Sequence, residues 1–414
     1  MSELDHPAGS RVMTRLDELA RFSAEPDALT RLFLSAEHGR AAEQVLAWMT
    51  EAGMSASLDA AGNVAGRYEG RTPDLPALLL GSHIDTVRNA GKYDGNLGVV
   101  AAIEAVMALH RGGTRLPFAI EVIAFGDEEG VRFPVTLTGS RAVAGTFDPA
   151  ALDAVDEGGV TMRDALLGFG CDPAAIGAVA RPRAGVLGYV EVHIEQGPVL
   201  EAENLPVGIV TAINAANRFT IVLSGMAGHA GTVPMALRRD ALCAAAEMIL
   251  ATERLALETE GLVATVGRIE VQPGAANVIP SGARFTLDIR SPSGGTRDEA
   301  VGRLSDAFAG IAERRRIGLD LRRTYNEAAA TCDPALVAQL EQAVARAGIR
   351  PLRLPSGAGH DGLAMVALCP VAMLFVRCAG GISHNPAEAI TEADADVAVR
   401  VLADFLRNFQ PGAS

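Results

Sequence analysis

Side chains that commonly bind metal ions follow apolar runs or stand in glycine-rich turns at several places in this sequence. They are His83 and Asp85 in LLLGSHIDT, Asp94 in GKYDGNLG, Glu128 and Glu129 in AFGDEEG, His193 in VEVHIEQG and His384 in GGISHNP. The end of a buried strand is where an α/β sheet presents side chains to a ligand. Histidines and carboxylates collected in this way are typical of a hydrolase that uses two metal ions.

The spacing of these residues suggests how two metal ions could share one ligand. Asp94 stands in a turn, and its two carboxylate oxygens could each bind one ion. We expect Glu129 and His384 to complete one position, and His83 with His193 to complete the other. Imidazole and carboxylate ligands without a thiolate suit Zn²⁺, Mn²⁺, Co²⁺ or Ni²⁺ and do not choose among them. The sequence therefore predicts two divalent ions per subunit.

Three carboxylates are predicted to act around these ligands. Asp85 follows His83 by two positions, so its carboxylate could accept the second imidazole proton, fix the tautomer and make the histidine a stronger ligand. Glu128 and Glu129 are adjacent and can divide their roles. A metal ion can lower the pKa of water to about 7, so a nearby carboxylate suffices as general base. We assign Glu128 as the base and Glu129 as a ligand.

An ordinary structural role is the alternative at each of these positions. Taken singly, each histidine would usually be a polar group without a ligand, and Asp-Glu-Glu would usually be a solvated turn. Several such motifs at predicted strand ends are difficult to explain by structure alone, and this favours the metal-site hypothesis.

A second set of polar groups could hold a substrate. Arg290 in LDIRSP, on a predicted strand, is suited to a bidentate clamp on a carboxylate, although a surface ion pair explains it equally well. His229 in GMAGHAGTVP could bind substrate or cap a turn. The further candidates are Gln196 in HIEQGP, Asn277 in GAANVIPSG, and Gly359 and His360 in PSGAGHDG.

The hydrophobic pattern predicts an α/β protein with a mixed sheet covered by helices, because continuous apolar strands alternate with helical spacing. A block of different character, with the order strand, helix, strand, strand, helix, fits a small inserted α+β domain. We therefore expect a catalytic domain formed by residues 1–213 and 328–414, interrupted by an inserted domain over 214–327. The predicted strands are 75–83, 118–125, 188–194, 208–213, 218–224, 261–271 and 283–291; the predicted helices are 14–22, 41–52, 96–111, 234–254, 296–316 and 393–409, and 364–376 is predicted core.

Composition excludes several classes of partner. The formal net charge of −14 argues against nucleic acid and anionic membranes, which attract basic patches. The 5 cysteines form no C-x-x-C pair and suggest neither a disulfide framework nor a structural zinc site. The N-terminal residues contain no apolar signal segment, and no apolar stretch is long enough to span a bilayer. We expect a cytoplasmic protein.

Several motifs together resemble one family. They are GSHIDTV, GKYDGNLGV, DEEGVRF, GSRAVAG, HIEQGPVLE, GHAGTVPM, ANVIPSG and GAGHDG, and the resemblance runs from about Arg15 to Phe409. The chain resembles the M20-type metal-dependent amidohydrolases, in the branch of allantoate amidohydrolases, N-carbamoyl-L-amino-acid hydrolases, ureidoglycolate amidohydrolases and β-ureidopropionases. Peptidase relatives usually carry an acidic residue at the position of His193, so the HIEQGP context favours ureido substrates over peptides.

The resemblance implies a dinuclear catalytic domain interrupted by a lid that also forms the interface of a homodimer. By matching motifs, the metal ligands and the base are the residues assigned above. His229, Asn277 and Arg290 would bind the substrate, some of them across the dimer. Family members bind Mn²⁺, Zn²⁺, Ni²⁺ or Co²⁺, so the resemblance leaves the identity of the metal open.

The choice of substrate depends on the same motifs. The segment from Asn89 to Asp94 and the DEEGVRF motif resemble those of allantoate hydrolases more than those of typical carbamoylases. Our primary prediction is hydrolysis of allantoate with release of ammonia and CO₂. The close alternative is an N-carbamoyl-L-amino acid, and ureidoglycolate and β-ureidopropionate are related substrates. An aminopeptidase would need no ureido group, and a non-catalytic module would have lost a ligand or Glu128, which this chain has not.

Overall fold

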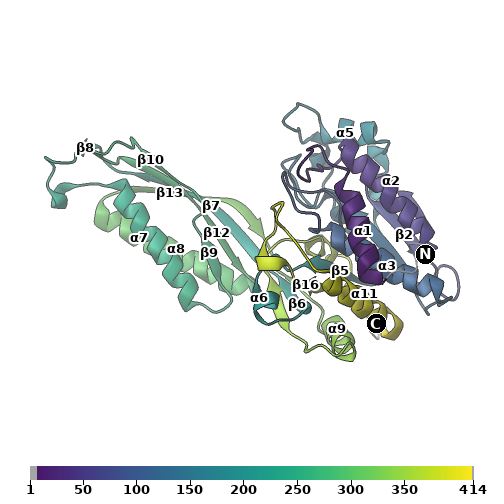
Figure 1. Cartoon of the computed structure of the whole chain (residues 1–414). Helices are drawn as coiled ribbons and strands as arrows, with labels where there is room; N and C mark the ends of the chain where they lie inside the picture. Colours follow the sequence, from purple (N-terminus) through teal and green to yellow (C-terminus); the bar gives the residue numbers. More distant parts are fainter. Residues whose placement is uncertain (1–6, 413–414) are drawn as a thin grey trace. The chain divides into compact units, whose positions relative to one another are not determined.

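The chain divides into two compact units in the computed structural model, which describes residues 7–412. Unit 1 runs up to Thr211 and resumes at Thr331, and unit 2 is Ala212–Ala330. The boundaries expected from the sequence, 214 and 327, lie within three residues of these positions. Each unit has its own sheet and helices (Figure 1). None of the helices in residues 7–412 is long and apolar enough to cross a membrane.

A mixed sheet forms the centre of unit 1. Its strand order is β1-β2-β4-β3-β5-β16-β6-β14, with β15 paired to β6. Strands β4, β3, β5 and β16 run parallel, and the register aligns His83 with Phe125 and His193 with Phe375. The carboxyl ends of these four strands therefore meet at one edge. The bounds are β1 (Ser55–Leu58), β2 (Val64–Tyr68), β3 (Ala77–His83), β4 (Ala119–Phe125), β5 (Val186–Ile194), β6 (Val207–Ile213), β14 (Ala330–Thr331), β15 (Arg353–Ser356) and β16 (Val371–Val376).

Helices cover both faces of this sheet, because its parallel strands are apolar on both sides. Strand β3 is buried along its whole length, so Leu78 and Leu80 point to one layer and Leu79 to the other. Helices α1, α3 and α11 lie together on one face (Figure 1), and α4, α5 and α10 add to the core on the other. The bounds are α1 (Ala8–Ala20), α2 (Ala36–Glu51), α3 (Asn96–Arg111), α4 (Thr138–Ala144), α5 (Met162–Phe169), α6 (Val199–Ala202), α9 (Pro334–Arg346), α10 (Gly362–Met365) and α11 (Glu392–Asn408), with 3₁₀ helices at Pro149–Asp153, Pro173–Val179, Arg183–Gly185 and Ala379–Gly381.

Helix α3 lies unusually close to the sheet at Gly98. A Cβ atom at this position would stand 2.1 Å from the carbonyl oxygen of Val192 and 2.7 Å from Cβ of Ser82. Glycine inside a helix normally destabilises it, so the close approach explains why this residue is glycine. The contact brings the first turn of α3, and the residues just before it, against the ends of β3 and β5.

Unit 2 is an antiparallel sheet with two long helices. The strand order is β10-β12-β7-β13, β9 pairs with β12, and β11 pairs with β8 in a separate two-stranded sheet. Alternate residues of β7 and β12, such as Ile221 and Phe285, pack in one core with residues of α7 and α8, which lie side by side (Figure 1). The bounds are β7 (Ala215–Ser224), β8 (Gly228–His229), β9 (Val263–Thr265), β10 (Ile269–Gln272), β11 (Val278–Ile279), β12 (Gly282–Ser291), β13 (Gly318–Glu327), α7 (Ala241–Glu258) and α8 (Gly294–Arg315), with a 3₁₀ helix at Met235–Leu237.

The prediction of an α/β protein with a mixed sheet is confirmed, but several elements differ from the expected ones. The helix predicted over 234–254 begins later, because Asp240 accepts the N–H of Cys243 and caps α7. The strand predicted over 261–271 is two strands, β9 and β10. Helix α1 begins six residues before its predicted start. Strand β13 was not predicted, because half of it is exposed and its polar residues interrupt the apolar pattern.

Candidate metal centre

The residues predicted as metal ligands come together at the carboxyl edge of the parallel strands. His83 is the last residue of β3, and His193 is the last but one of β5. Glu128 and Glu129 follow the end of β4, and Asp94 lies in the turn before α3. All of these side chains are almost completely buried. This edge is where open α/β sheets bind ligands.

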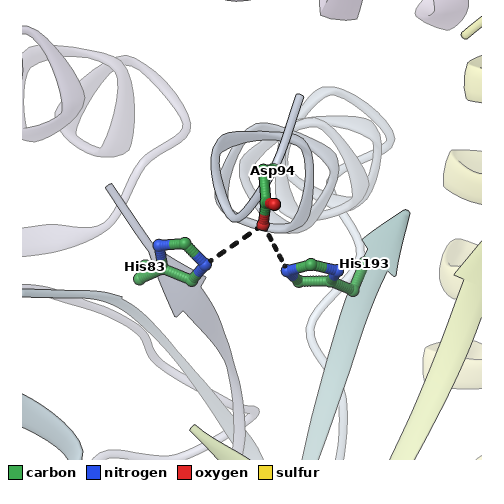
Figure 2. A group of neighbouring side chains, drawn as sticks. All are labelled: His83, Asp94 and His193. Carbon is green, nitrogen blue, oxygen red and sulfur yellow. Dashed lines mark ion pairs between the residues drawn. The ribbon is translucent and has the colours of Figure 1, made fainter. Parts of the chain in front are cut away.

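One oxygen of Asp94 faces two histidines. Its Oδ1 atom lies 3.5 Å from Nε2 of His83 and 3.1 Å from Nε2 of His193. Figure 2 shows the carboxylate between the two rings, with one imidazole on each side. Ligand atoms of these three residues all lie within 4.8 Å of one another. They could therefore hold one metal ion.

The other oxygen of Asp94 faces a second group. Its Oδ2 atom lies 3.2 Å from Nε2 of His384, and the same nitrogen lies 3.7 Å from Oε2 of Glu129. His384 is half exposed, whereas Asp94 and Glu129 are buried, so this group opens toward solvent. Ligand atoms of the three residues also lie within 4.8 Å of one another. Asp94 thus belongs to two separate ligand groups, one through each oxygen.

Both buried histidines direct Nε2 toward Asp94, because their other ring nitrogen bonds to a main-chain carbonyl. Nδ1 of His83 lies 3.0 Å from the carbonyl oxygen of Asp85, and Nδ1 of His193 lies 2.9 Å from that of Ile194. The expected acceptor for His83 was the Asp85 carboxylate, which is 3.8 Å away. That carboxylate instead accepts the N–H groups of Glu128 and Glu129 at 3.2 and 3.3 Å. Asp85 therefore orients the two glutamates as well as the histidine.

Burial and charge perturb the acids of this site in opposite directions. Burial raises the pKa of Glu128 well above its usual value and raises the pKa of Glu129 to about 7. Burial also opposes ionisation of Asp94, but hydrogen bonds with His193, His384 and His83 outweigh it and hold the Asp94 pKa well below the usual value. The hydrogen bond to Asp94 raises the pKa of His384 to about 9. Clusters of perturbed groups at a sheet edge are typical of functional sites.

The backbone around the site is strained at three non-glycine residues. Asp127, Gln196 and His384 have φ angles of 67°, 57° and 54°. These values lie in the left-handed region, which the backbone of residues other than glycine rarely adopts. Each of them adjoins or carries a group of the site. Such strain persists only where surrounding contacts fix the backbone, and it is concentrated at functional sites.

The residues present fit divalent metal ions. Among the described residues, Oε1 of Glu129 is buried and has no hydrogen-bond partner, which is costly for a carboxylate unless a cation binds it. The two groups combine imidazole nitrogens with carboxylate oxygens and include no thiolate. This donor set suits zinc, manganese, cobalt or nickel.

The other residues predicted in unit 1 lie around the same groups. The side-chain amide of Gln196 donates to Oδ2 of Asp94 at 2.8 Å. The ring of His360 is buried against that of His193, with centroids 4.4 Å apart, and its Nε2 lies 2.6 Å from Oγ of Ser356. A Cβ atom on Gly359 would lie 3.8 Å from Oε1 of Glu128. In this structure Gln196 and His360 contact metal-site residues directly.

The residues predicted in unit 2 are not all neighbours. His229 is exposed on β8 and pairs with Val278, and the carbonyl of Asn277 accepts the N–H of Ala230. Arg290 lies on β12 and pairs with Val263 of β9, and Figure 1 shows β9 and β8 toward opposite ends of the unit. Its Nε and Nη2 atoms donate to Asp288 at 2.7 and 3.0 Å. The ion pair considered as the alternative for Arg290 is therefore present.

Sequence reasoning missed three residues that fix the ligand turns. Glu388 accepts the N–H groups of Tyr93 and Asp94, and Ser383 donates to Asp94. Arg31 is fully buried, and its guanidinium donates to the carbonyl of Ile84 and to the side chain of Asn96. Ser383 and Glu388 stand within a few residues of His384, which was the available signal. Nothing near Arg31 in the sequence indicates its role.

Comparisons with known proteins identify the family of this chain. Residues 79–408 match the sequence profile of peptidase family M20/M25/M40. The chain is 42% identical to an N-carbamoyl-L-amino acid amidohydrolase of Geobacillus stearothermophilus, over 95% of this chain and 97% of that protein. It is also 42% identical to a probable allantoate deiminase of Oryza sativa subsp. japonica, over 95% of this chain and 87% of that protein.

The fold is similar to that of solved structures. An amidase of the hydantoinase/carbamoylase family from Burkholderia multivorans superposes with a TM-score of 0.91 at 33% identity, over 96% of this chain and 97% of that one. The similarity therefore covers residues of both units.

Replacing Asp94 by asparagine should weaken metal binding, because the neutral amide keeps the shape of the side chain but removes the charge shared by the two groups. We expect the dissociation constant for Mn²⁺ to rise by at least about tenfold. Competition with a fluorescent chelator measures it, with Asp153→Asn, an exposed aspartate, as the matched control. Equal Mn²⁺ affinity in Asp94→Asn and the wild type would contradict a metal site at Asp94.

Proposed function

The chain belongs to peptidase family M20/M25/M40, in the branch of N-carbamoyl-L-amino-acid amidohydrolases and allantoate deiminases, and we propose that it hydrolyses a ureido C–N bond next to a carboxylate, with allantoate as substrate. Membership of this branch makes it an amidohydrolase that acts on C–N bonds other than peptide bonds. The observation that supports the mechanism best is the position of Asp94, with one oxygen in each ligand group.

The choice of allantoate depends on the motifs around Asn89–Asp94 and Glu128. An N-carbamoyl-L-amino acid is the second candidate, because the chain has the same sequence identity, 42%, to a relative named for that substrate and to one named for allantoate. Ureidoglycolate and β-ureidopropionate share the same chemical features, a ureido group and a carboxylate. The same residues could act on any of these substrates.

We propose that two divalent ions bind per chain. His83 and His193 would hold one with Oδ1 of Asp94, and Glu129 and His384 would hold the other with Oδ2. Zn²⁺ or Mn²⁺ is the expected ion, and Co²⁺ and Ni²⁺ suit the same donors. When bound, such ions polarise a carbonyl group and lower the pKa of water.

Glu128 is positioned to move protons in the hydrolysis. Its Oε2 atom lies 3.9 Å from Nε2 of His83, and its backbone N–H is held by Asp85. Burial favours its protonated form, so once it has taken a proton from the attacking water it can deliver that proton to the leaving nitrogen. A Cβ atom on Gly359 would make only an ordinary van der Waals contact with this carboxylate, at 3.8 Å from Oε1.

Substrate recognition is assigned to polar groups of both units. Arg290 would bind the carboxylate, with its guanidinium already oriented by Asp288. Gln196, His229, Asn277 and His360 are the other proposed substrate-binding residues, and unit 2 is the proposed lid and dimerisation domain. A bound carboxylate would share or replace the contact of Arg290 with Asp288.

The layout of unit 2 supports a homodimer. Strand β12 begins at Gly282, close in sequence to β11, and Arg290 stands eight residues further along β12. In an extended strand, eight residues span roughly 27 Å. His229 and Asn277 lie beyond that beginning, so they and Arg290 of one chain cannot contact the same small substrate. A second copy of the chain could supply the missing group. Helix α7 exposes Leu242, Leu250 and Leu257, which such a copy could cover.

We also propose a cytoplasmic location, because the five cysteines are free thiols and most are buried. Cell fractionation with an antibody against the chain would test this, and recovery in an oxidising compartment would contradict it.

Glu128→Gln should keep the metal ions but lose most turnover, because the amide preserves the shape of the side chain and cannot accept a proton. Loss of a general base typically lowers the rate by about 10²–10⁴-fold. Metal analysis of the purified variant accompanies the kinetics. Turnover close to that of the wild type would remove Glu128 from the mechanism, and loss of metal would make it a ligand instead.

Mixed dimers should recover activity from two inactive variants. His229→Ala and Arg290→Ala chains, co-expressed with different tags, would form hybrids in which one of the two sites keeps both groups. An equal mixture should then show roughly a quarter of the wild-type activity. Hybrids without activity would mean that both groups act within one chain, and failure to isolate hybrids would contradict the dimer.

The substrate proposal is tested by a panel of compounds with metal-loaded protein. Ammonia and product formation would be measured for allantoate, ureidoglycolate, β-ureidopropionate, N-carbamoyl-L-amino acids and dipeptides. We expect the highest kcat/KM for allantoate and no cleavage of dipeptides. A higher kcat/KM for an N-carbamoyl-L-amino acid would replace allantoate by the second candidate, and activity confined to dipeptides would contradict a ureido substrate.

A further inference from the structure

Glu388 has a buried carboxylate that belongs to neither ligand group. It forms hydrogen bonds with the turn that carries Asp94. Its Oε1 atom accepts the main-chain N–H groups of Tyr93 at 2.8 Å and of Asp94 at 3.0 Å. The residues are almost 300 positions apart in the sequence, and Glu388 is only 4% exposed. Two adjacent N–H groups that share one carboxylate oxygen have little freedom to rotate, so Glu388 fixes the direction of this turn.

The other oxygen of Glu388 is linked to the loop that carries His384. Oγ of Ser383 lies 3.1 Å from Oε2 of Glu388 and 2.7 Å from Oδ2 of Asp94. A hydroxyl has one proton, so Ser383 donates to one of these two carboxylates at a time and lies within hydrogen-bond distance of both. The side-chain amide of Gln196 donates to both Asp94 and Ser383. Glu388, Ser383 and Gln196 therefore connect the Asp94 turn to the residue next to His384.

The turn is shaped to accept the Glu388 side chain. A Cβ atom on Gly91 would stand 2.3 Å from Cβ of Glu388 and 2.4 Å from its Oε1 atom. Any side chain at position 91 would therefore displace this carboxylate. The φ angle of Gly91 is not in the left-handed region, so the space needed by Glu388, and not backbone conformation, accounts for the glycine.

We propose that Glu388 is a positioning residue that fastens the Asp94 turn to the His384 loop and so sets two ligands of the solvent-facing metal position relative to each other. His83 and His193 are held by separate carbonyl groups at the ends of β3 and β5, so their position does not depend on this contact. Asp94 also contacts His83 and His193 through Oδ1, so losing Glu388 should weaken both ions, but the solvent-facing ion much more, because two of its ligands are displaced relative to each other. This inference depends on the two-ion site proposed above.

Mn²⁺ binding by the full chain tests the proposal. The two dissociation constants would be measured by chelator competition in the wild type, Glu388→Ala and Glu388→Gln. In Glu388→Ala we expect one constant to rise by about 10–100-fold, as is typical when a group that orients a ligand is removed, and the other to rise much less. Glu388→Gln should bind both ions nearly as the wild type does, because its carbonyl oxygen can still accept both N–H groups. Glu392→Ala, an exposed glutamate at the start of α11, is the matched control.

Two further measurements separate positioning from general stability. Gly91→Ala should reproduce the unequal weakening of the two ions, because it displaces the carboxylate without removing it. In the metal-free protein, hydrogen exchange at the amides of Tyr93 and Asp94 should be faster in Glu388→Ala and Gly91→Ala than in the wild type. It should be unchanged in Glu388→Gln. If Glu388→Ala does not fold, Gly91→Ala decides the question by the same readouts.

The outcomes distinguish this inference from the proposed site itself. A wild type that binds fewer than two ions would contradict the two-ion site. A wild type that binds two ions, with both constants unchanged in folded Glu388→Ala or Gly91→Ala, would contradict the role of Glu388 alone. Equal weakening of both ions would also overturn it, because the contact would then support the whole edge of the sheet.

Discussion

The structure of this site depends on a buried carboxylate, that of Asp94, which is charged in an environment that disfavours charge. Burying an ionised group without compensation is costly, and three imidazoles provide the compensation by facing its two oxygens. They come from β3, β5 and the loop before α11, which are distant in sequence. Three features bring these segments to one carboxylate: the parallel strands, the close approach of α3 at Gly98 and the contact with Glu388.

Much of the fold and the site could be predicted from the sequence, because strand ends leave a local pattern. The apolar run before His83 and that before His193 predicted both strands, and parallel strands align their carboxyl ends. Glu388 and Arg31 could not be found in this way, since their partners lie far away in the chain and their neighbours have no distinctive spacing. Strand β13 was missed for another reason: an exposed edge strand does not need an apolar face.

Unit 2 shows where chemical reasoning from residue type is incomplete. The fork of Arg290 suits a carboxylate, and in this structure the carboxylate is that of Asp288, two residues away on the same face of β12. The alternation of side chains along a strand places them together, so the pair could be anticipated from the spacing. The distance between Arg290 and His229 could not, because it depends on the path of the whole unit. That distance makes the second copy of the chain part of the proposed site.

The most direct test of the central claim is anomalous X-ray diffraction from crystals of the protein loaded with Mn²⁺. The account predicts two anomalous peaks in each chain, one beside Oδ1 of Asp94 with His83 and His193, and one beside Oδ2 with Glu129 and His384. A single peak, or two peaks of which only one contacts Asp94, would contradict the sharing of this carboxylate between two ions.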